Sequence, residues 1–464
     1  MKKAVSYVLL VLAIALVAAW SGLSGRQVLA VAVFASFIVG TLLFWPFRLA
    51  FALAGIAVLL ASGLLDIAHL IEFASLDVIL FLVGMMIVIG YLENQHFFEN
   101  ALDRVLPFLG GSAVKLMTSL MAIAFISAAL VDEVTSILFM SAIMLRLCRH
   151  YKLNPIPFII MTVFATNIGS GATVVGNPIG VLIALRAGLA FPDFIRWATP
   201  NAIAAWLVTV VLSFVFFKKP MAQLQEAIDR ERSAAGEAAA SGEASAGGQK
   251  KSILFPTLLF VGTIVGLLSH KVIEHALHLE HNVMLVGTAL LAAGIVLFVE
   301  RERARELVEK RVDWWTLAFF MLLFASAGTL RYVGVTEHVA KGIVNVTGGE
   351  IVPLVWLIGV GIGLLSAFMD NVLAVASFIP IVGDLANSGV NAGPLWWAML
   401  FGGTIFGNLT LIGSTANIIA VGLMEREEKK HISFMEWFWP GLVTAIPSFL
   451  VALLILLVQL PLLL

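Results

Sequence analysis

Residues 164–184 read FATNIGSGATVVGNPIGVLIA, a stretch that is apolar enough for a membrane but unsuited to one continuous helix. Its middle contains five helix-breaking residues, Gly169, Gly171, Gly176, Pro178 and Gly180. Such residues leave backbone N–H and C=O groups unpaired, and hydrocarbon cannot satisfy these groups. The segment therefore predicts two half-helices that meet at a break facing a polar site, as in the discontinuous helices of secondary transporters.

The composition of the whole chain indicates a polytopic membrane protein. Of its 464 residues, 61% are hydrophobic and 12% are charged, and the mean hydropathy is +1.02. A soluble domain is nearer half apolar and a quarter charged. The net charge of −1 offers no basic field for nucleic acid, and the single Cys148 excludes an internal disulfide and a multi-thiolate metal site within one chain.

The second half of the chain repeats the pattern of the first. The segment ALVDEV at 129–134 aligns with AFMDNV at 367–372, and GNPIG at 176–180 aligns with GSTAN at 413–417. The two aligned motifs are separated by nearly equal lengths of chain in both halves. In each half, an overlong apolar stretch interrupted by an acid predicts a re-entrant hairpin, and a glycine-rich apolar stretch predicts a broken helix.

The fold class that follows is all-α, with about 11 transmembrane helices plus two re-entrant hairpins and two broken helices in an inverted repeat. We expect these parts in order: an extra N-terminal helix (1–25), repeat one (26–219) with a hairpin (113–150) and a broken helix (156–188), a flexible cytoplasmic linker (220–251) with a helical start near Met221 to Ser233, and repeat two (252–464) with a hairpin (351–388) and a broken helix (393–424).

The distribution of Lys and Arg predicts the orientation. With the N-terminus in the cytoplasm, most basic residues of the short loops fall on that side, as the positive-inside rule requires. The two repeats then have opposite topology, which is the arrangement that supports alternating access. The apolar N-terminal segment also resembles a signal sequence, and we expect an uncleaved first helix instead.

Three carboxylates interrupt the predicted hairpins: Asp132, Glu133 and Asp370. Intramembrane carboxylates are costly and commonly mark ion or proton pathways. An acid at a hairpin tip can equally cap the helix that follows it, and Glu133 could simply face cytoplasmic water. Because two adjacent acids suit a proton carrier, we assign proton coupling to these three residues.

Hydroxyl and amide side chains cluster around both predicted breaks. One such residue in a membrane helix usually joins helices, but a cluster at a glycine break indicates binding. These groups suit Na⁺ or a neutral polyol-like solute, whereas half-helix N-termini suit an anion. The predicted substrate or ion site comprises Asp132, Glu133, Thr135, Ser136, Thr166, Asn167, Gly169, Ser170, Thr173, Gly176, Asn177, Asp370, Asn371, Asn408, Thr410, Gly413, Ser414, Thr415 and Asn417.

Basic residues are absent from both predicted sites. No Lys or Arg occurs between Lys152 and Arg186 or between Lys341 and Arg426. A multivalent anion would meet three acids and no fixed cation, which favours a cation or an uncharged solute as cargo. Four histidines between 270 and 281 have a spacing that zinc could use, but we expect a solvated outer loop there and no metal site.

These motifs resemble those of the ion transporter superfamily. The residues that show the resemblance are TNIGSGATVVGNP at 166–178, GNLTLIGSTAN at 407–417 and the acidic hairpin tips. The nearest branch is that of the ArsB/NhaD/P-protein permeases, with the divalent-anion:Na⁺ symporters as more distant kin. The resemblance implies a scaffold domain, a moving transport domain formed by 113–188 and 351–424, and a homodimer formed through the scaffold.

The resemblance also implies a choice of activities: export of arsenite or antimonite, Na⁺/H⁺ exchange, or import of carboxylates. Two departures from the pattern favour proton coupling over a symmetric pair of Na⁺ sites. Glu133 stands where relatives commonly have Asn, and Gly180 stands where many have Asn, as Asn417 does in repeat two.

The leading prediction is therefore a proton-coupled secondary transporter, not an enzyme, in a bacterial inner membrane. It would export arsenite or antimonite by elevator-like alternating access, with no cofactor other than bound Na⁺. A cytoplasmic ATPase is an expected partner if it belongs to an arsenite system. The alternatives are a Na⁺/H⁺ antiporter, a Na⁺-coupled carboxylate importer and, outside transport, a membrane scaffold or sensor.

Overall fold

The computed structural model describes residues 2–98, 100, 111–238 and 254–463, and this part of the chain contains helices and no strand. Ten helices within it are long and apolar enough to cross a membrane. The expected all-helical membrane fold is confirmed. The helices have the following bounds: α1 Lys2–Trp20, α2 Gly25–Leu43, η1 Trp45–Phe47, α3 Arg48–Ala61, α4 Ile67–Phe73, α5 Leu76–Asn94, α7 Ala113–Leu130, α8 Glu133–His150, α9 Ile156–Ser170, α10 Pro178–Ala187, α11 Phe191–Phe216, α12 Lys218–Ala238, α13 Leu254–Leu277, α14 Val283–Glu300, η4 Arg301–Arg303, α15 Ala304–Arg311, α16 Trp314–Tyr332, α17 Val335–Thr347, α18 Ile351–Phe368, α19 Asn371–Asn387, α20 Gly393–Ile405, η5 Phe406–Asn408, α21 Thr415–Leu423, η6 Met424–Glu428 and α22 Phe434–Leu463.

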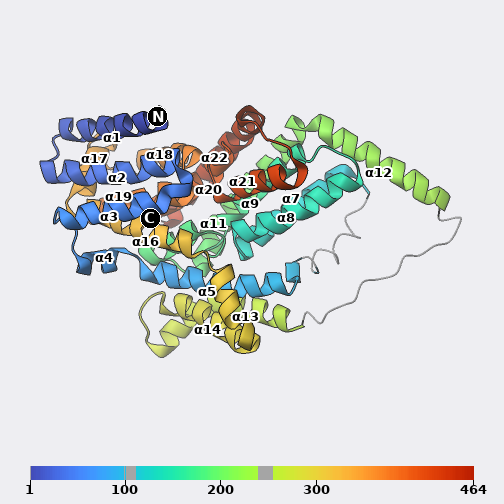
Figure 1. Cartoon of the computed structure of the whole chain (residues 1–464), viewed down its shortest axis with the longest axis horizontal. Coiled ribbons are helices and arrows are strands. Elements are labelled where there is room, and N and C mark those ends of the chain that lie inside the picture. Colours follow the sequence, from blue (N-terminus) through green and yellow to red (C-terminus); the bar gives the residue numbers. More distant parts are fainter. Residues whose placement is uncertain (1, 99, 101–110, 239–253, 464) are drawn as a thin grey trace.

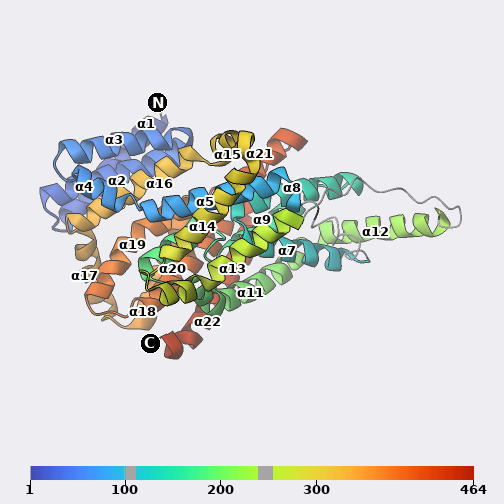
Figure 2. The same cartoon turned by 90° about the horizontal axis from the view of Figure 1, so that it is seen from below.

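The helices pack into two groups. In the scaffold bundle, α1–α5 and α13–α16, helix α5 packs against α14, and α16 packs against α2, α3 and α4. In the hairpin bundle, α7–α11 and α18–α22, helix α11 packs against α22, α7 packs against α9, and α18 packs against α20. Figures 1 and 2 show α12 projecting at one end of the molecule, with α4 and α17 at the opposite end. We call these ends the α12 face and the α17 face.

Both hairpins reverse at an acid that caps the returning helix. The side chain of Asp132 accepts a hydrogen bond from the N–H of Thr135 at 2.8 Å, and Asp370 accepts one from the N–H of Val372 at 3.0 Å. Each bond satisfies a backbone donor at the start of a helix, which hydrocarbon could not do. The caps explain why α8 and α19 begin inside the protein.

Both broken helices restart in the same way after an irregular segment. Between α9 and α10 the chain is non-helical, and Asn177 caps α10 by accepting from the N–H of Gly180 at 2.7 Å. Between η5 and α21 the chain is again non-helical, and Ser414 caps α21 by accepting from the N–H of Ala416 at 3.1 Å. The hairpins and breaks therefore lie where the sequence predicts them.

The two repeats are inverted with respect to each other. Hairpin one (α7 and α8) opens at the α12 face, where the N–H of Ala113 donates to Gln225 of α12 at 2.8 Å. Hairpin two (α18 and α19) opens at the α17 face, where Thr336 of α17 donates to Asp384 of α19 at 2.5 Å. The two hairpin tips thus enter the protein from opposite faces.

The segment expected as a linker at 220–251 begins with a helix, as expected for its start, but this helix is longer than the expected range of 221–233. The chain forms helix α12 as far as Ala238, and the remaining residues of the expected linker lie outside the described residues. Met221, Leu224 and Ile228 are buried on one side of this helix against the hairpin bundle. This apolar stripe at helical spacing stabilises the helix.

The histidine-rich segment also differs from the expectation. His270 and His275 belong to α13, which continues to Leu277, and His270 is buried. The solvated loop predicted there is therefore shorter than expected.

Candidate functional site

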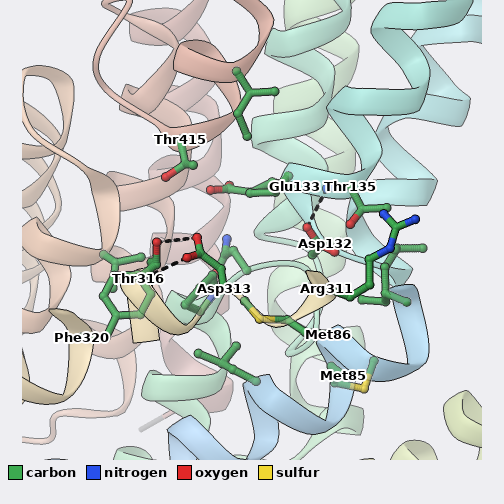
Figure 3. A pocket seen from close by; sticks show the side chains of 18 of the residues that line it. Met85, Met86, Asp132, Glu133, Thr135, Arg311, Asp313, Thr316, Phe320 and Thr415 are labelled. Atoms are coloured by element: carbon green, nitrogen blue, oxygen red, sulfur yellow. Dashed lines mark hydrogen bonds between the residues drawn. The ribbon is translucent and has the colours of Figure 1, made fainter. Parts of the chain in front are cut away.

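A cavity of about 230 Å³ lies between the hairpin tips and the scaffold bundle. Figure 3 shows side chains from both bundles pointing into it. The lining residues used below are Arg48, Met85, Met86, Glu93, Asp132, Glu133, Thr135, Asn177, Arg311, Asp313, Thr316, Asp370 and Thr415. Arg311 and Glu93, at its α12-face end, are partly exposed, whereas Glu133 and Asp370 are buried. The cavity therefore extends from the buried hairpin tips toward the α12 face.

Glu133 is the most enclosed acid of this cavity, with an exposed fraction of 3%. The Ser170 hydroxyl donates to its Oε2 at 3.0 Å, and the side chain of Asn371 also hydrogen-bonds to it. Asn371 is the residue of repeat two that corresponds to Glu133, so the two equivalent tip residues contact each other. Glu133 is therefore buried between the two hairpin tips and does not lie on the outer surface.

Asp132 and Asp370 act as caps and also line the cavity. The second carboxylate oxygen of Asp370 accepts a hydrogen bond from Thr415 at 2.8 Å, which joins hairpin two to the start of α21. None of the three acids has a basic partner within ion-pair distance among the described residues. A buried carboxylate without a bonded cation is costly, and such carboxylates commonly mark ion or proton pathways.

The two breaks meet at Asn167. Its Nδ2 donates to Oδ1 of Asn408 and to Oδ1 of Asn417, both at 2.8 Å, and its Oδ1 accepts from Ser414 at 3.0 Å. Asn417 also donates to the carbonyls of Gly407 and Thr410, both at 2.7 Å. Amide side chains thus satisfy the backbone freed by the break and join the two repeats.

Two predicted site residues attach each break to its hairpin. The hydroxyl of Thr173 donates to the carbonyl of Ala129, and the hydroxyl of Thr410 donates to the carbonyl of Ala367. The same hydroxyls accept from the N–H groups of Val175 and Ile412 at 3.3 Å. The contacts of the two threonines match atom for atom, as expected for a repeat. Both hydroxyls are used in hydrogen bonds to backbone groups.

Three predicted glycines allow close approach of backbones. A Cβ on Gly169 would lie 2.2 Å from the carbonyl oxygen of Phe125, and one on Gly176 would lie 2.3 Å from that of Ser170. A Cβ on Gly413 would lie 2.7 Å from the carbonyl oxygen of Gly407. These glycines are therefore needed for packing around the breaks.

The remaining predicted residues divide between the cavity and the interior. Thr135 and Asn177 line the cavity. Thr166 donates to the carbonyl of Thr162 one turn earlier at 3.0 Å and is enclosed within α9. The oxygens of Ser136 and Asn371 are buried without a hydrogen-bond partner in the structure.

The structure corrects the expectation that no fixed cation accompanies the acids. Arg48 and Arg311, both from the scaffold bundle, line the same cavity. Arg48 donates to Thr316 at 2.9 Å and lies over the ring of Trp45, 4.4 Å from its centre. Arg311 donates to Glu93 at 2.8 Å. Both arginines lie next to predicted scaffold spans. They line the same cavity as the acids only because helices distant in sequence pack together.

Scaffold residues that the sequence reasoning missed complete the cavity wall. Asp313 caps α16 by accepting from the N–H of Thr316 at 3.1 Å, and the Thr316 hydroxyl donates to it at 2.6 Å. Met85 and Met86 form an apolar part of the wall on α5. The Asp-x-x-Thr spacing at 313–316 is a helix-start signal and could have been found. The apolar sequence around the methionines contains no comparable signal.

Comparisons with known proteins agree with this architecture. The sequence profile of the citrate transporter family (CitMHS) matches residues 38–402 and, in a second match, residues 283–462. An uncharacterized transporter of Mycobacterium bovis is 31% identical over 81% of this chain and 85% of its own length. The P protein of Homo sapiens is 25% identical over 88% of this chain and 56% of its own length.

A solved structure with the same fold is that of the YdaH transporter of Alcanivorax borkumensis. Its TM-score is 0.56 at 16% identity, and the match covers 88% of this chain and 89% of that one. The predicted resemblance to P-protein-type permeases is confirmed, while the arsenite and Na⁺/H⁺ branches stay predictions. The chain therefore belongs to the citrate transporter family and is a secondary transporter of the ion transporter type.

Proposed function

We propose that this chain is a proton-coupled secondary transporter in which the hairpin bundle moves against the scaffold bundle. The observation that supports this most is the convergence of Asp132, Glu133 and Asp370, from two hairpins that enter from opposite faces, on one cavity at the boundary between the bundles. A site in that position can be presented to either face by an elevator-like displacement of one bundle.

Glu133 is the proposed proton carrier. It is buried, and its hydrogen-bond partners, Ser170 and Asn371, are both neutral. Asp132 and Asp370 cap helices, so their proposed part in coupling is electrostatic support of Glu133. A bound Na⁺ in place of the proton is the alternative, and the unpartnered oxygens of Ser136 and Asn371 favour it.

For the cargo, we propose arsenite or antimonite, exported through this cavity. In an elevator, the groups that carry the cargo must travel with it. The polar groups that the hairpin bundle contributes to the cavity are carboxylates, hydroxyls and an amide, and these suit an uncharged, hydroxyl-bearing solute. Arg48 and Arg311 belong to the scaffold, and each already contacts scaffold residues, namely Thr316 and Glu93.

A small carboxylate anion is the second candidate. The family profile is that of citrate transporters, and the Arg48 guanidinium has no carboxylate within ion-pair distance among the described residues. A carboxylate would need co-bound cations to offset the three acids. Na⁺/H⁺ exchange by the same acids is the third candidate.

The setting and partners are proposals as well. We propose a bacterial inner membrane with the N-terminus and α12 in the cytoplasm, so that the cavity faces the cytoplasm. A homodimer through the scaffold bundle, and a cytoplasmic ATPase in an arsenite system, are the proposed protein partners.

Transport by everted membrane vesicles tests the cargo. Accumulation of arsenite driven by a proton gradient supports the first candidate. If citrate moves and arsenite does not, and if Arg48→Gln abolishes the citrate movement, the cargo is a carboxylate anion. If Na⁺ alone collapses a proton gradient, the protein is a Na⁺/H⁺ antiporter. Vesicles without the protein give the background.

A further inference from the structure

Ion pairs between the two bundles occur at one face of the molecule. Among the described residues, three pairs join the scaffold bundle to the hairpin bundle: Asp77 with Arg186, Arg331 with Asp384, and Lys271 with Asp193. All three lie at the α17 face. At the α12 face, Arg149 pairs with Glu427 and Glu428 within the hairpin bundle, and Arg311 pairs with Glu93 within the scaffold.

Two of these bridging pairs have more than one contact. Arg186, near the end of α10, donates to both carboxylate oxygens of Asp77 at 3.0 and 3.1 Å and to Ser75 at 2.6 Å. Such a two-pronged contact fixes orientation as well as distance. Arg331, near the end of α16, donates to Asp384 at 3.0 Å. The other oxygen of Asp384 accepts from Thr336, so this carboxylate is held by groups outside the hairpin bundle.

The third pair, Lys271 with Asp193, also lies at the α17 face. Lys271 of α13 lies 2.8 Å from Asp193 in the first turn of α11. Asp193 also accepts from the N–H of Ala190 at 2.7 Å, which holds the carboxylate in place. The attachment therefore uses the ends of three elements of the hairpin bundle: α10, α11 and α19.

A second cavity at the α17 face lies beside two of these pairs. Its volume is about 580 Å³, and it is lined by Arg186 and Arg331 and by residues of both bundles, among them Ser75, Ala376 and Trp396. It is separate from the acid-lined cavity, whose lining residues are different.

We infer that these three ion pairs form a latch that closes the α17 face while the acid-lined cavity is open toward the α12 face. This inference rests on the proposed alternating access, because a latch has meaning only if the bundles move apart. The Asp77–Arg186 and Lys271–Asp193 pairs are partly exposed, so water can replace them at modest cost, whereas Asp384 of the third pair is buried and keeps its hydrogen bond from Thr336. The two partly exposed pairs can therefore break and re-form during each transport cycle.

The latch makes a directional prediction. Neutralising the acids of all three pairs, in Asp77→Asn/Asp193→Asn/Asp384→Asn, removes attractions found only in the present state. The ratio of the two states should then shift toward one in which the α17 face is open, by about two- to five-fold for each pair. Asparagine keeps the size of the side chain and part of its hydrogen bonding.

Cysteine labelling measures this shift without any cargo. In a Cys148→Ala background, Met86→Cys reports on the acid-lined cavity and Ala376→Cys on the second cavity. In nanodiscs, where a thiol reagent reaches both faces, the triple variant should label Ala376→Cys several-fold faster and Met86→Cys several-fold slower. Glu337→Gln, which removes an ion pair within α17 at the same face, is the matched control and should change neither rate.

Unchanged rates at both positions in the triple variant would overturn the latch. A charge exchange covers the case in which that variant fails to fold: Arg331→Asp with Asp384→Arg should label like the parent, and Asp384→Arg alone should not. If the exchange behaves like the single reversal, local packing sets the rates and the inference fails. Shifted labelling in a protein that transports none of the three cargoes would keep the latch and reject the proposed function.

Discussion

At the scale of single residues, the sequence predicted a binding role for the polar groups at the breaks and hairpin tips, and the structure shows which groups each of them contacts. Asn167, Asn417 and Ser414 were identified as ligands, and the structure shows that they satisfy each other and the freed backbone at the junction of the breaks. Glu133 was identified by its departure from the pattern, and the structure gives it a buried setting. The sequence did not point to Arg48, because a basic residue beside a predicted span is typical of a loop. Only the packing of the helices shows that it lines the cavity.

Removing the Asn167 side chain tests the junction. Asn167→Ala deletes three buried hydrogen bonds and leaves the oxygens of Asn408 and Asn417 without this donor. Each unsatisfied buried group costs about 1–3 kcal/mol, so we expect a loss of about 3 kcal/mol in the free energy of unfolding. Thermal unfolding in detergent should show a melting temperature several degrees lower.

The neighbouring Thr166→Val is the matched control, because Thr166 is equally buried but bonds only within its own helix. If both variants lowered the melting temperature equally, the junction would have no special role.

At the scale of elements, the hairpins and broken helices followed from the sequence because breakers and intramembrane acids are rare in apolar segments. For α12, the sequence predicted a helical start but not the full length or the docking of the helix, because alanine and charged residues dominate its composition. Its apolar stripe amounts to a few residues, and the surface that receives them is built by helices distant in sequence. Short amphipathic elements of this kind are therefore the part of the fold that the sequence predicts least.

The docking of α12 can be tested by one substitution. Leu224 is 1% exposed, so Leu224→Asp buries a charge in its contact and should release the helix. Limited proteolysis within 218–238 should become at least several-fold faster. Gln223→Asp, next to it on the exposed side, should leave the rate unchanged. Equal digestion of both variants would show that α12 is not held by this stripe.

The polar contacts of α12 predict a pH dependence. The Tyr151 hydroxyl and His150 hydrogen-bond to Glu231, and they hold the pKa of that carboxyl below its usual range. A lowered pKa adds stability that is complete above the ordinary carboxyl pKa of about 4 and is lost as the pH falls through the lowered value. Proteolysis of α12 should therefore be constant between pH 8 and pH 5 and accelerate only below about pH 4. Proteolysis that stays constant down to pH 3 would show that the Glu231 carboxylate does not help to hold α12.

At the scale of the whole molecule, two inverted repeats produce two bundles with one acid-lined cavity between them. The sequence predicted the inversion from the distribution of basic residues, and the hairpins do enter from opposite faces. The relative position of the bundles could not be predicted, because it depends on contacts between helices that are distant in sequence. The cavity extending toward the α12 face and the ion pairs at the α17 face both follow from that position.

Proton coupling through Glu133 is the central claim, and proton flux in proteoliposomes measures it most directly. With a pH-sensitive dye inside, arsenite movement by the parent protein should be accompanied by proton movement in the opposite direction. In Glu133→Gln, the proton signal should vanish, and arsenite flux should lose its pH dependence or fall at least tenfold. Glu309→Gln, on the exposed side of α15, should behave like the parent. A Glu133→Gln protein that kept the parent's proton signal and pH dependence would contradict the account.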